Sequence, residues 1–238
     1  KMASIFFQIL IFSDFNLPNR KAYTQKVDEL IAVDLKNENT ILKHLDIATG
    51  TGRRALNIKK ICELDYEVVG VDISAEMCKI AQKRGLRTYH QDWANDDTHT
   101  GEMFDFATFL YAFGHIANSE NRIKTLNKIN AYLNKNGVLY FDLFSVDNQN
   151  EWGPLALSAF HKNNLNKYNY EEGDVFYRKR GCKEIAFLHY FNLPEIESIL
   201  AQTGFKIEWV KNVGYAKNPG EIVKTEKEGN YFVKARKV

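Results

Sequence analysis

The segment Leu45-Asp-Ile-Ala-Thr-Gly-Thr-Gly-Arg-Arg-Ala55 decides how this chain is expected to fold. Apolar residues before it have the length of a strand, and apolar residues after it recur at helical spacing. Gly50 and Gly52 lack a Cβ atom, so the loop between strand and helix can turn sharply and approach a ligand closely. The free N–H groups at the start of the helix favour an anionic or polar ligand. The segment therefore predicts a strand, a glycine loop and a helix that bind a nucleotide-like molecule.

Length and composition indicate one large α/β domain. The chain has 238 residues, of which 45% are hydrophobic and 26% charged, and its net charge is +2. A charge so close to zero gives no general attraction to nucleic acid or to a membrane surface. The widely spaced Cys62, Cys78 and Cys182 indicate buried thiols in a reducing compartment. We therefore expect a cytoplasmic protein without a nucleic-acid or membrane partner.

The first 40 residues are expected to form an N-terminal cap segment, and residues 41–238 the main domain. The apolar run from Ile5 to Phe12 is too short to span a bilayer and precedes no cleavage-site pattern, so it is interpreted as a packing segment. Apolar spacing predicts a helix from Lys21 to Leu35. This helix would cover the main domain.

Strands and helices alternate between residues 41 and 143. After the first strand, further strands are predicted at residues 67–72, 86–91, 104–110 and 138–143. Ser74 can cap the helix that follows the strand at residues 67–72, and Asn136-Gly137 is expected to end the helix before the strand at residues 138–143. The last two, at residues 205–213 and 231–236, follow one another without a helix and should pair antiparallel. The predicted fold class is therefore α/β: a doubly wound, mostly parallel seven-stranded sheet with helices on both faces and an antiparallel last strand.

The alternation breaks down between about residues 145 and 190. Residues 166–178 and 183–191 have the composition of strands around turn signals at Glu172-Gly173 and Arg180-Gly181. An inserted antiparallel hairpin or small sheet is expected here. Beyond it, Asn192 and Glu195 have the spacing of a capping box, and Gly204 is expected to end that helix.

Acidic residues follow the second and third predicted strands. Asp72 could accept hydrogen bonds from the hydroxyls of a ribose, and Asp92 could meet an adenine amino group. Ile73 and Trp93 are available as apolar walls. Each aspartate alone would more often be a loop residue or a helix cap. Because the carboxyl ends of neighbouring parallel strands meet at one edge of a sheet, the set predicts a single nucleotide site.

Two cofactors fit these features. Gly50 to Ala55 matches the G-x-G-x-x-A pattern of dinucleotide-binding proteins, with Asp72 as the ribose acid, so an NAD(P)-dependent oxidoreductase stays open. Four features around the loop favour a cofactor other than a dinucleotide. They are Asp46 four residues before Gly50, the Asp92-Trp93 pair, the strand at residues 104–110, and the terminal antiparallel pair.

Together these residues resemble the class I S-adenosylmethionine-dependent methyltransferases, and the resemblance runs from about Leu42 to the end, outside the insertion. Their D-x-G-x-G-x-G motif reads Asp46-Ile-Ala-Thr-Gly-Thr-Gly52 here, with Ala48 in place of the first glycine. The resemblance implies a Rossmann-like domain with S-adenosylmethionine as cofactor. The loop backbone would hold its methionine part, Asp72 its ribose, and Asp92 with Trp93 its adenine. The strand end at residues 109–111 would flank its reacting sulfonium. The implied cofactor-binding residues are Asp46, Ala48, Thr49, Gly50, Gly52, Asp72, Ile73, Asp92, Trp93 and Leu110.

The segments Leu110-Tyr-Ala-Phe-Gly-His-Ile116 and Phe191-Asn-Leu-Pro-Glu195, with the insertion, look like small-molecule methyltransferases, including glycine N-methyltransferase-like and amino-sugar N-methyltransferase-like enzymes. This implies methyl transfer to a nitrogen or oxygen of a small-molecule acceptor. If the acceptor is a hydroxyl or an ammonium, His115 is the predicted catalytic base, because imidazole titrates near neutral pH. A capping or packing histidine is an equally good interpretation of His115.

Other functions are kept as alternatives. The fold could serve as a non-catalytic cofactor-binding module. An RNA methyltransferase is less favoured, because basic and aromatic residues interleave only locally, around residues 168–180. No metal is expected, because the histidines show no ligand spacing with the cysteines or with each other.

Overall fold

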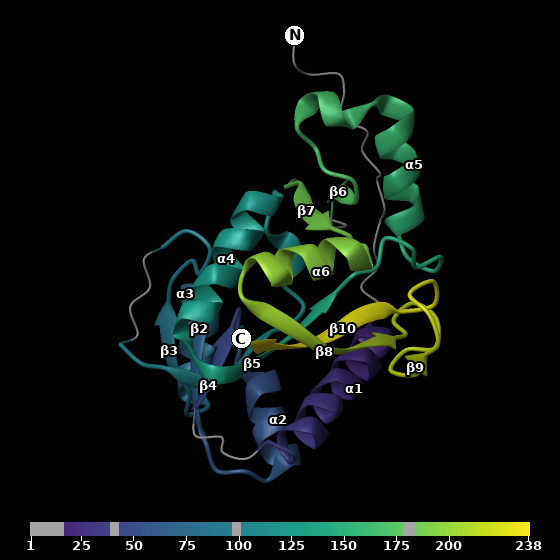
Figure 1. Cartoon of the computed structure of the whole chain (residues 1–238). Coiled ribbons are helices and arrows are strands. Elements are labelled where there is room, and N and C mark those ends of the chain that lie inside the picture. Colours follow the sequence, from purple (N-terminus) through teal and green to yellow (C-terminus); the bar gives the residue numbers. More distant parts are fainter. Residues whose placement is uncertain (1–16, 39–42, 97–100, 179–183) are drawn as a thin grey trace.

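The computed structural model describes residues 17–38, 43–96, 101–178 and 184–238, and its centre is an eight-stranded sheet (Figure 1). The strand order is β3-β2-β1-β4-β5-β10-β8-β9. The strands are β1 (Lys43–Ile47), β2 (Glu67–Asp72), β3 (Arg87–His90), β4 (Phe104–Phe109), β5 (Leu133–Leu143), β8 (Phe205–Val213), β9 (Ile222–Val223) and β10 (Asn230–Lys237). The apolar run from Ile5 to Phe12 lies outside the described residues, as does the turn at Arg180-Gly181.

Strands β1 to β5 run parallel, and β10 lies antiparallel between β5 and β8. The predicted seven strands and the antiparallel last strand are therefore confirmed. The two-residue β9 pairs with the end of β8 and adds an eighth strand at the edge. Because sequential parallel strands need crossovers, the helices between them must cover the two faces of the sheet.

Helices cover both faces of the sheet (Figure 1). On one face, α1 (Leu17–Leu35), α2 (Arg53–Cys62) and α3 (Ala75–Lys83) contribute to one apolar core, and on the other α4 (Ser119–Tyr132) and α6 (Leu193–Gln202) contribute to a second. The central strands supply side chains to both cores: Leu45 and Ile47 to one, Phe106 to the other. No helix in the described part of the chain is long and apolar enough to cross a membrane.

The predicted caps are confirmed. Ser74 accepts a hydrogen bond from the Met77 N–H at 3.4 Å, and Asn192 accepts one from the Glu195 N–H at 2.8 Å. Gly204 has a left-handed backbone at the end of α6.

Two predicted boundaries are wrong. Helix α1 begins at Leu17, and α4 ends at Tyr132, before the expected stop at Asn136-Gly137. Strand β5 starts early because Leu133 pairs with Phe104 of β4 and its carbonyl accepts a hydrogen bond from the Lys237 ammonium.

The insertion contains the predicted hairpin and a helix that was not predicted. Strands β6 (Asp174–Tyr177) and β7 (Ala186–His189) pair antiparallel, while residues 165–168 form the 3-10 turn η2 (Leu165–Tyr168) instead of the expected strand. Helix α5 (Gly153–Asn163) starts with Pro154 in its first turn and lies with the hairpin above the sheet in Figure 1. A third apolar cluster joins them, which includes Val146, Ala156 and Val175. This packing depends on distant residues, so local pattern could not predict it.

An ion-pair network attaches the hairpin to α4 and α6. The side chain of Arg122 is 1% exposed and pairs with the carboxylates of Glu171 and Glu195. The ring of His189 lies 2.7 Å from Asp174 Oδ1 and 3.2 Å from Glu195 Oε2. Glu171, Asp174 and His189 also bring three possible metal ligand atoms within 4.8 Å of one another, but here they pair with Arg122, Glu195 and each other. In this network the buried guanidinium of Arg122 faces carboxylates of opposite charge, which offset the cost of removing it from water.

We predict that His189→Gln destabilises the fold more at low pH than at high pH. Burial lowers the pKa of His189, but the hydrogen bonds to Asp174 and Glu195 outweigh it and raise the pKa above the ordinary 6.5. The protonated ring therefore stabilises the fold fully below 6.5, and this contribution is lost as pH rises through the raised pKa. Urea unfolding should show a loss of about 1–3 kcal/mol near about pH 6 and a smaller loss near about pH 9.

The matched control is His161→Gln, because His161 is 66% exposed and pairs with Glu172 on the surface. Its effect should be small at both pH values. A pH-independent loss in His189→Gln would contradict the charged network.

Candidate functional site

A cavity of about 370 Å³ lies at the carboxyl ends of β1, β2, β3 and β4. Six of the predicted site residues line it: Ala48, Asp72, Ile73, Asp92, Trp93 and His115. They come from the ends of three strands, β1, β2 and β3, and from the 3-10 turn η1 (Phe113–His115). The fold therefore brings together residues that the sequence places up to 67 positions apart, from Ala48 to His115. Crevices of this kind, outside the carboxyl ends of parallel strands, are where open α/β sheets bind ligands.

The glycine loop needs left-handed backbone at three positions. Ala48, Gly50 and Gly52 have φ values of 57°, 55° and 73°. A Cβ atom on Gly52 would lie 2.9 Å from Leu86 Cδ2, so α2 could not approach the strands so closely with a larger residue there. A Cβ atom on Gly50 would meet nothing within 4 Å, so the loop is open on that side. The left-handed backbone is therefore what favours glycine at that position.

The carboxylate of Asp72 holds the glycine loop from the neighbouring strand. Its Oδ2 accepts a hydrogen bond from the Gly50 N–H at 2.7 Å, and its Oδ1 accepts one from the Ser74 N–H at 2.8 Å. Each carboxylate oxygen can accept a further hydrogen bond. Asp72 can therefore shape the loop and receive ligand hydroxyls at the same time.

Asp46 lies beneath the loop, outside the residues that line the cavity. It is 4% exposed, and its two oxygens accept hydrogen bonds of 2.6 Å from the hydroxyls of Thr49 and Thr108. Burial raises the pKa of Asp46, while both hydroxyls act in the opposite direction. Thr108 Oγ1 lies 2.7 Å from the ring of His44, whose pKa burial lowers to about 3. A neutral His44 therefore completes a buried hydrogen-bond chain from β1 to β4.

The far end of the cavity combines apolar surface with a carboxylate. Ile73 is 67% exposed, whereas Trp93 is 5% exposed. The carboxylate of Asp92 accepts hydrogen bonds from the Ala94 N–H and the Asn95 side chain at 3.0 and 2.8 Å. An exposed isoleucine beside a tryptophan offers surface that a flat, apolar ring could cover.

Leu110 and His115 lie in different surroundings. Leu110 is 7% exposed and packs in the core beneath α1 and α2, and it is not among the residues that line the cavity. His115 is exposed at the cavity, and its Nδ1 lies 2.7 Å from the Phe187 carbonyl oxygen of the hairpin. With a proton on Nδ1, its Nε2 carries the lone pair that a base needs. The catalytic role of His115 stays a prediction.

Arg54 is a functional candidate that the sequence analysis missed. Its Nε donates to Asp28 at 2.7 Å, while its two terminal nitrogens are buried without a hydrogen-bond partner among the described residues. Asp142 lies nearby, and its Oδ2 is also buried with no hydrogen-bond partner in the described part of the chain. Unsatisfied buried donors are costly, so they mark a place for an acceptor. The available signal was a basic residue in the first turn of the helix after the glycine loop.

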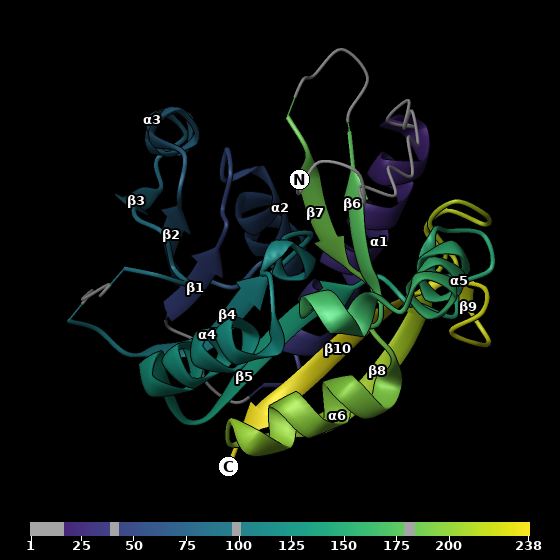
Figure 2. The same ribbon diagram turned by 90° about the horizontal axis from the view of Figure 1, so that it is seen from above.

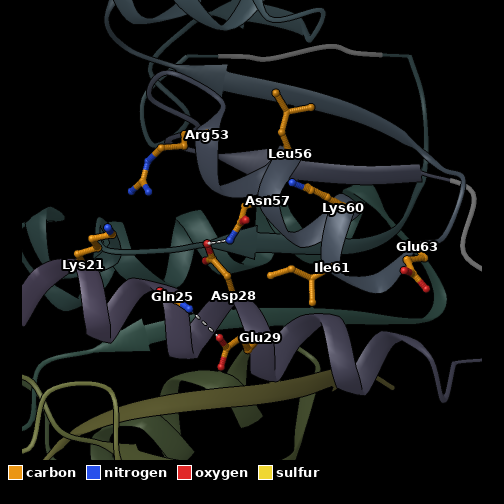
Figure 3. A pocket seen from close by; sticks show the side chains of 10 residues that line it. All are labelled: Lys21, Gln25, Asp28, Glu29, Arg53, Leu56, Asn57, Lys60, Ile61 and Glu63. Carbon is orange, nitrogen blue, oxygen red and sulfur yellow. Dashed lines mark hydrogen bonds between the residues drawn. The ribbon is translucent and has the colours of Figure 1, made fainter.

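A larger hollow of about 750 Å³ lies between α1 and α2, away from the strand ends (Figure 3). Polar side chains on its walls pair with one another. Gln25 donates to Glu29, and Asn57 donates to Asp28, each at 3.0 Å. The smaller cavity, which collects the glycine loop and the strand-end acids, is the better candidate site.

Known methyltransferases are similar to this chain in sequence. A family model described as a methyltransferase domain matches residues 18–210. A glycine/sarcosine N-methyltransferase from Halorhodospira halochloris is 38% identical over 111 residues, which cover 43% of this chain and 40% of that protein. The match to this curated relative thus spans about two fifths of its length.

Solved methyltransferase structures share the fold. An S-adenosylmethionine-dependent methyltransferase from Methanosarcina mazei has a TM-score of 0.65 at 18% identity, covering 87% of this chain and 97% of that one. A 1,6-didemethyltoxoflavin-N1-methyltransferase from Burkholderia thailandensis, solved with 1,6-didemethyltoxoflavin and S-adenosylhomocysteine, has a TM-score of 0.61 at 16% identity, covering 94% and 81%. At these identities the likeness concerns the fold.

We predict that Thr108→Val destabilises the protein by about 1–3 kcal/mol, because it leaves a buried carboxylate oxygen of Asp46 without its donor. The matched control is Thr125→Val. Both threonines are fully buried, but the Thr125 hydroxyl has no partner in the described part of the chain. Urea unfolding should show little loss for Thr125→Val. Equal losses in the two variants would contradict the structural role of the Asp46 hydrogen bonds.

Proposed function

The chain belongs to the family of methyltransferase domains, and on this basis we propose that it transfers a methyl group from S-adenosylmethionine to a nitrogen or oxygen of a small-molecule acceptor. The observation that carries the proposal is the cavity where the glycine loop, Asp72, Ile73, Asp92 and Trp93 meet. The match to a methyltransferase model disfavours the NAD(P)-dependent oxidoreductase, which shares only the short glycine pattern and the ribose acid.

The cavity supports a definite assignment of the nucleoside. We propose that Asp72 receives the ribose hydroxyls, that Ile73 and Trp93 flank the adenine, and that Asp92 meets its amino group. The left-handed loop from Ala48 to Gly52, including Thr49, would meet the rest of the cofactor on the open side of Gly50, because the N–H groups of Thr49, Gly50 and Gly52 already donate within the protein. Asp46 would act through Thr49 and Thr108 by holding the loop in place. The predicted contact of Leu110 with the cofactor stays a prediction.

Arg54 fits the carboxylate of the methionine part. Its two unpartnered terminal nitrogens form the fork that binds a carboxylate with two hydrogen bonds. Bound S-adenosylmethionine supplies a methyl group on a good leaving group, so the protein contributes mainly by positioning the acceptor and excluding water.

The similar proteins and the insertion support a proposal for the acceptor and the residues that would bind it. Glycine/sarcosine N-methyltransferase, to which part of the chain is similar, is named for small acceptors. We propose residues 1–40 as a cap and the insertion as the cover of the acceptor, with His115 as the base and no nucleic acid as partner. A cytoplasmic location is also proposed, supported by the free, buried thiols of Cys62 and Cys78.

Calorimetry tests the cofactor directly. S-adenosylhomocysteine should bind, and NADH should not. Asp72→Ala should weaken S-adenosylhomocysteine binding by about tenfold to a hundredfold, because it removes a ribose acceptor and the hydrogen bond to Gly50. Asp65→Ala is the control, since the side chain of Asp65 is 104% exposed. Tight NADH binding, or an unchanged affinity in Asp72→Ala, would contradict the proposal.

A second prediction isolates Arg54. Arg54→Gln should weaken the binding of S-adenosylhomocysteine by about tenfold or more, because the carboxylate loses its charged partner. It should leave the binding of 5′-methylthioadenosine, which has the nucleoside but no carboxylate, almost unchanged. Calorimetry with both ligands separates this role from a general loss of structure, which would weaken both ligands alike.

A further inference from the structure

An aromatic cluster lies beside the end of β4, where the chain turns away from the sheet. Its rings come from five separate segments: Tyr23, Tyr111, Phe144, Tyr190 and Tyr215. The Tyr111 and Tyr215 hydroxyls are 2.8 Å apart, and ring centroids along the path from Tyr23 through Tyr215 and Phe144 to Tyr190 lie 5.4 to 5.9 Å apart. Rings at these distances form a continuous aromatic surface.

The position of the cluster relates it to the chemistry proposed above. Tyr111 directly follows Leu110, and by the resemblance this strand end flanks the sulfonium. Its left-handed backbone, with φ of 62°, is held by a hydrogen bond from its N–H to Asp142. The cluster therefore extends from the expected position of the methyl group toward the insertion.

One carboxylate borders this aromatic surface. Glu151 lies just before α5, and its Oε1 is buried without a hydrogen-bond partner among the described residues. Its carboxylate accepts a hydrogen bond from the main-chain N–H of Ala216, next to Tyr215. Burial raises the pKa of the Tyr190 and Tyr215 hydroxyls most, and Glu151 lies close enough to raise both further. A buried, half-satisfied carboxylate is costly, and a cationic ligand would relieve that cost.

The ring faces of the cluster are suited to cations. The guanidinium of Arg20 already lies over the Tyr111 ring, 4.7 Å from its centroid. Aromatic faces attract cations through their quadrupole, and the attraction is stronger where water is excluded. A carboxylate beside several such rings selects an ammonium group over a neutral hydroxyl, which gains neither the charge pair nor the contact with the rings.

We propose that Glu151 and the aromatic cluster form the binding site for the ammonium group of an amine acceptor. Before transfer the ammonium gives one proton to the Glu151 carboxylate, and the neutral nitrogen then attacks the methyl group while S-adenosylhomocysteine leaves. This rests on the proposed methyl transfer and narrows it from nitrogen or oxygen to nitrogen. Glu151 would be a specificity-determining residue that the insertion carries to the acceptor.

The ionisation of Glu151 makes the site sensitive to pH. Burial raises the pKa of Glu151 to about 7, and the Ala216 N–H acts in the opposite direction. The titratable and charged groups near it are the hydroxyls of Tyr190 and Tyr215, and Arg20 also lies near Tyr215. Cation binding should therefore strengthen as pH rises through about 7.

The experiment uses tetramethylammonium, whose charge does not change with pH, and its neutral counterpart tert-butanol. Saturation-transfer NMR with the full chain should detect tetramethylammonium binding and much weaker tert-butanol binding. Glu151→Gln should weaken tetramethylammonium binding by about tenfold or more and abolish its pH dependence. Glu151→Asp should retain part of the affinity. The matched control is Glu197→Gln, at an exposed position on α6, which should bind as the wild type does.

Thermal unfolding by circular dichroism checks that each variant is folded. Equal binding of tetramethylammonium to the wild type and Glu151→Gln, or no binding to either, would overturn the inference. The titration is run with and without S-adenosylhomocysteine, so it reports on Glu151 whether or not S-adenosylhomocysteine binds. S-adenosylhomocysteine binding without ammonium binding would leave the proposed methyl transfer intact and exclude only the amine site.

Discussion

The hydrogen bonds of two aspartates hold the glycine loop, and the rest of the site depends on them. Asp46 accepts from Thr49 in the loop and from Thr108 on β4, while Asp72 accepts from the Gly50 N–H. Strands β2 and β4 lie on either side of β1 in the sheet, so these hydrogen bonds join the loop to both neighbouring strands. Its left-handed backbone, which is unfavourable for Ala48, is maintained by these contacts.

The insertion is the second determinant of the site. The buried Arg122 joins the hairpin to α4 and α6 through Glu171 and Glu195. A hairpin attached in this way supplies the carbonyl of Phe187 that orients His115. The same part of the chain carries Glu151 to the aromatic cluster. The parallel sheet therefore provides the cavity at the strand ends, and the insertion provides the groups that we propose for the acceptor.

Much of the fold could be predicted from local pattern, because the deciding interactions are local. Ser74 and Asn192 cap helices with N–H groups three residues away. The insertion was predicted less well. Helix α5 was missed because its buried face depends on residues of β6 and β7, far along the chain. Glu195 has capping spacing, but its carboxylate pairs with Arg122 and His189, a choice that only the packing of α6 against α4 and the hairpin could make.

The sequence by itself determined the order of strands and helices outside the insertion, the glycine loop, and the strand-end residues Asp72, Asp92 and Trp93, because spacing and residue type report local conformation. Only the tertiary structure decided which polar side chains have hydrogen-bond partners. Arg54 and Glu151 look like ordinary surface charges in the sequence, yet the fold buries two nitrogens of Arg54 and one oxygen of Glu151 without partners among the described residues. Solvation and partner choice arise from contacts between distant segments, so no local pattern could reveal these two residues.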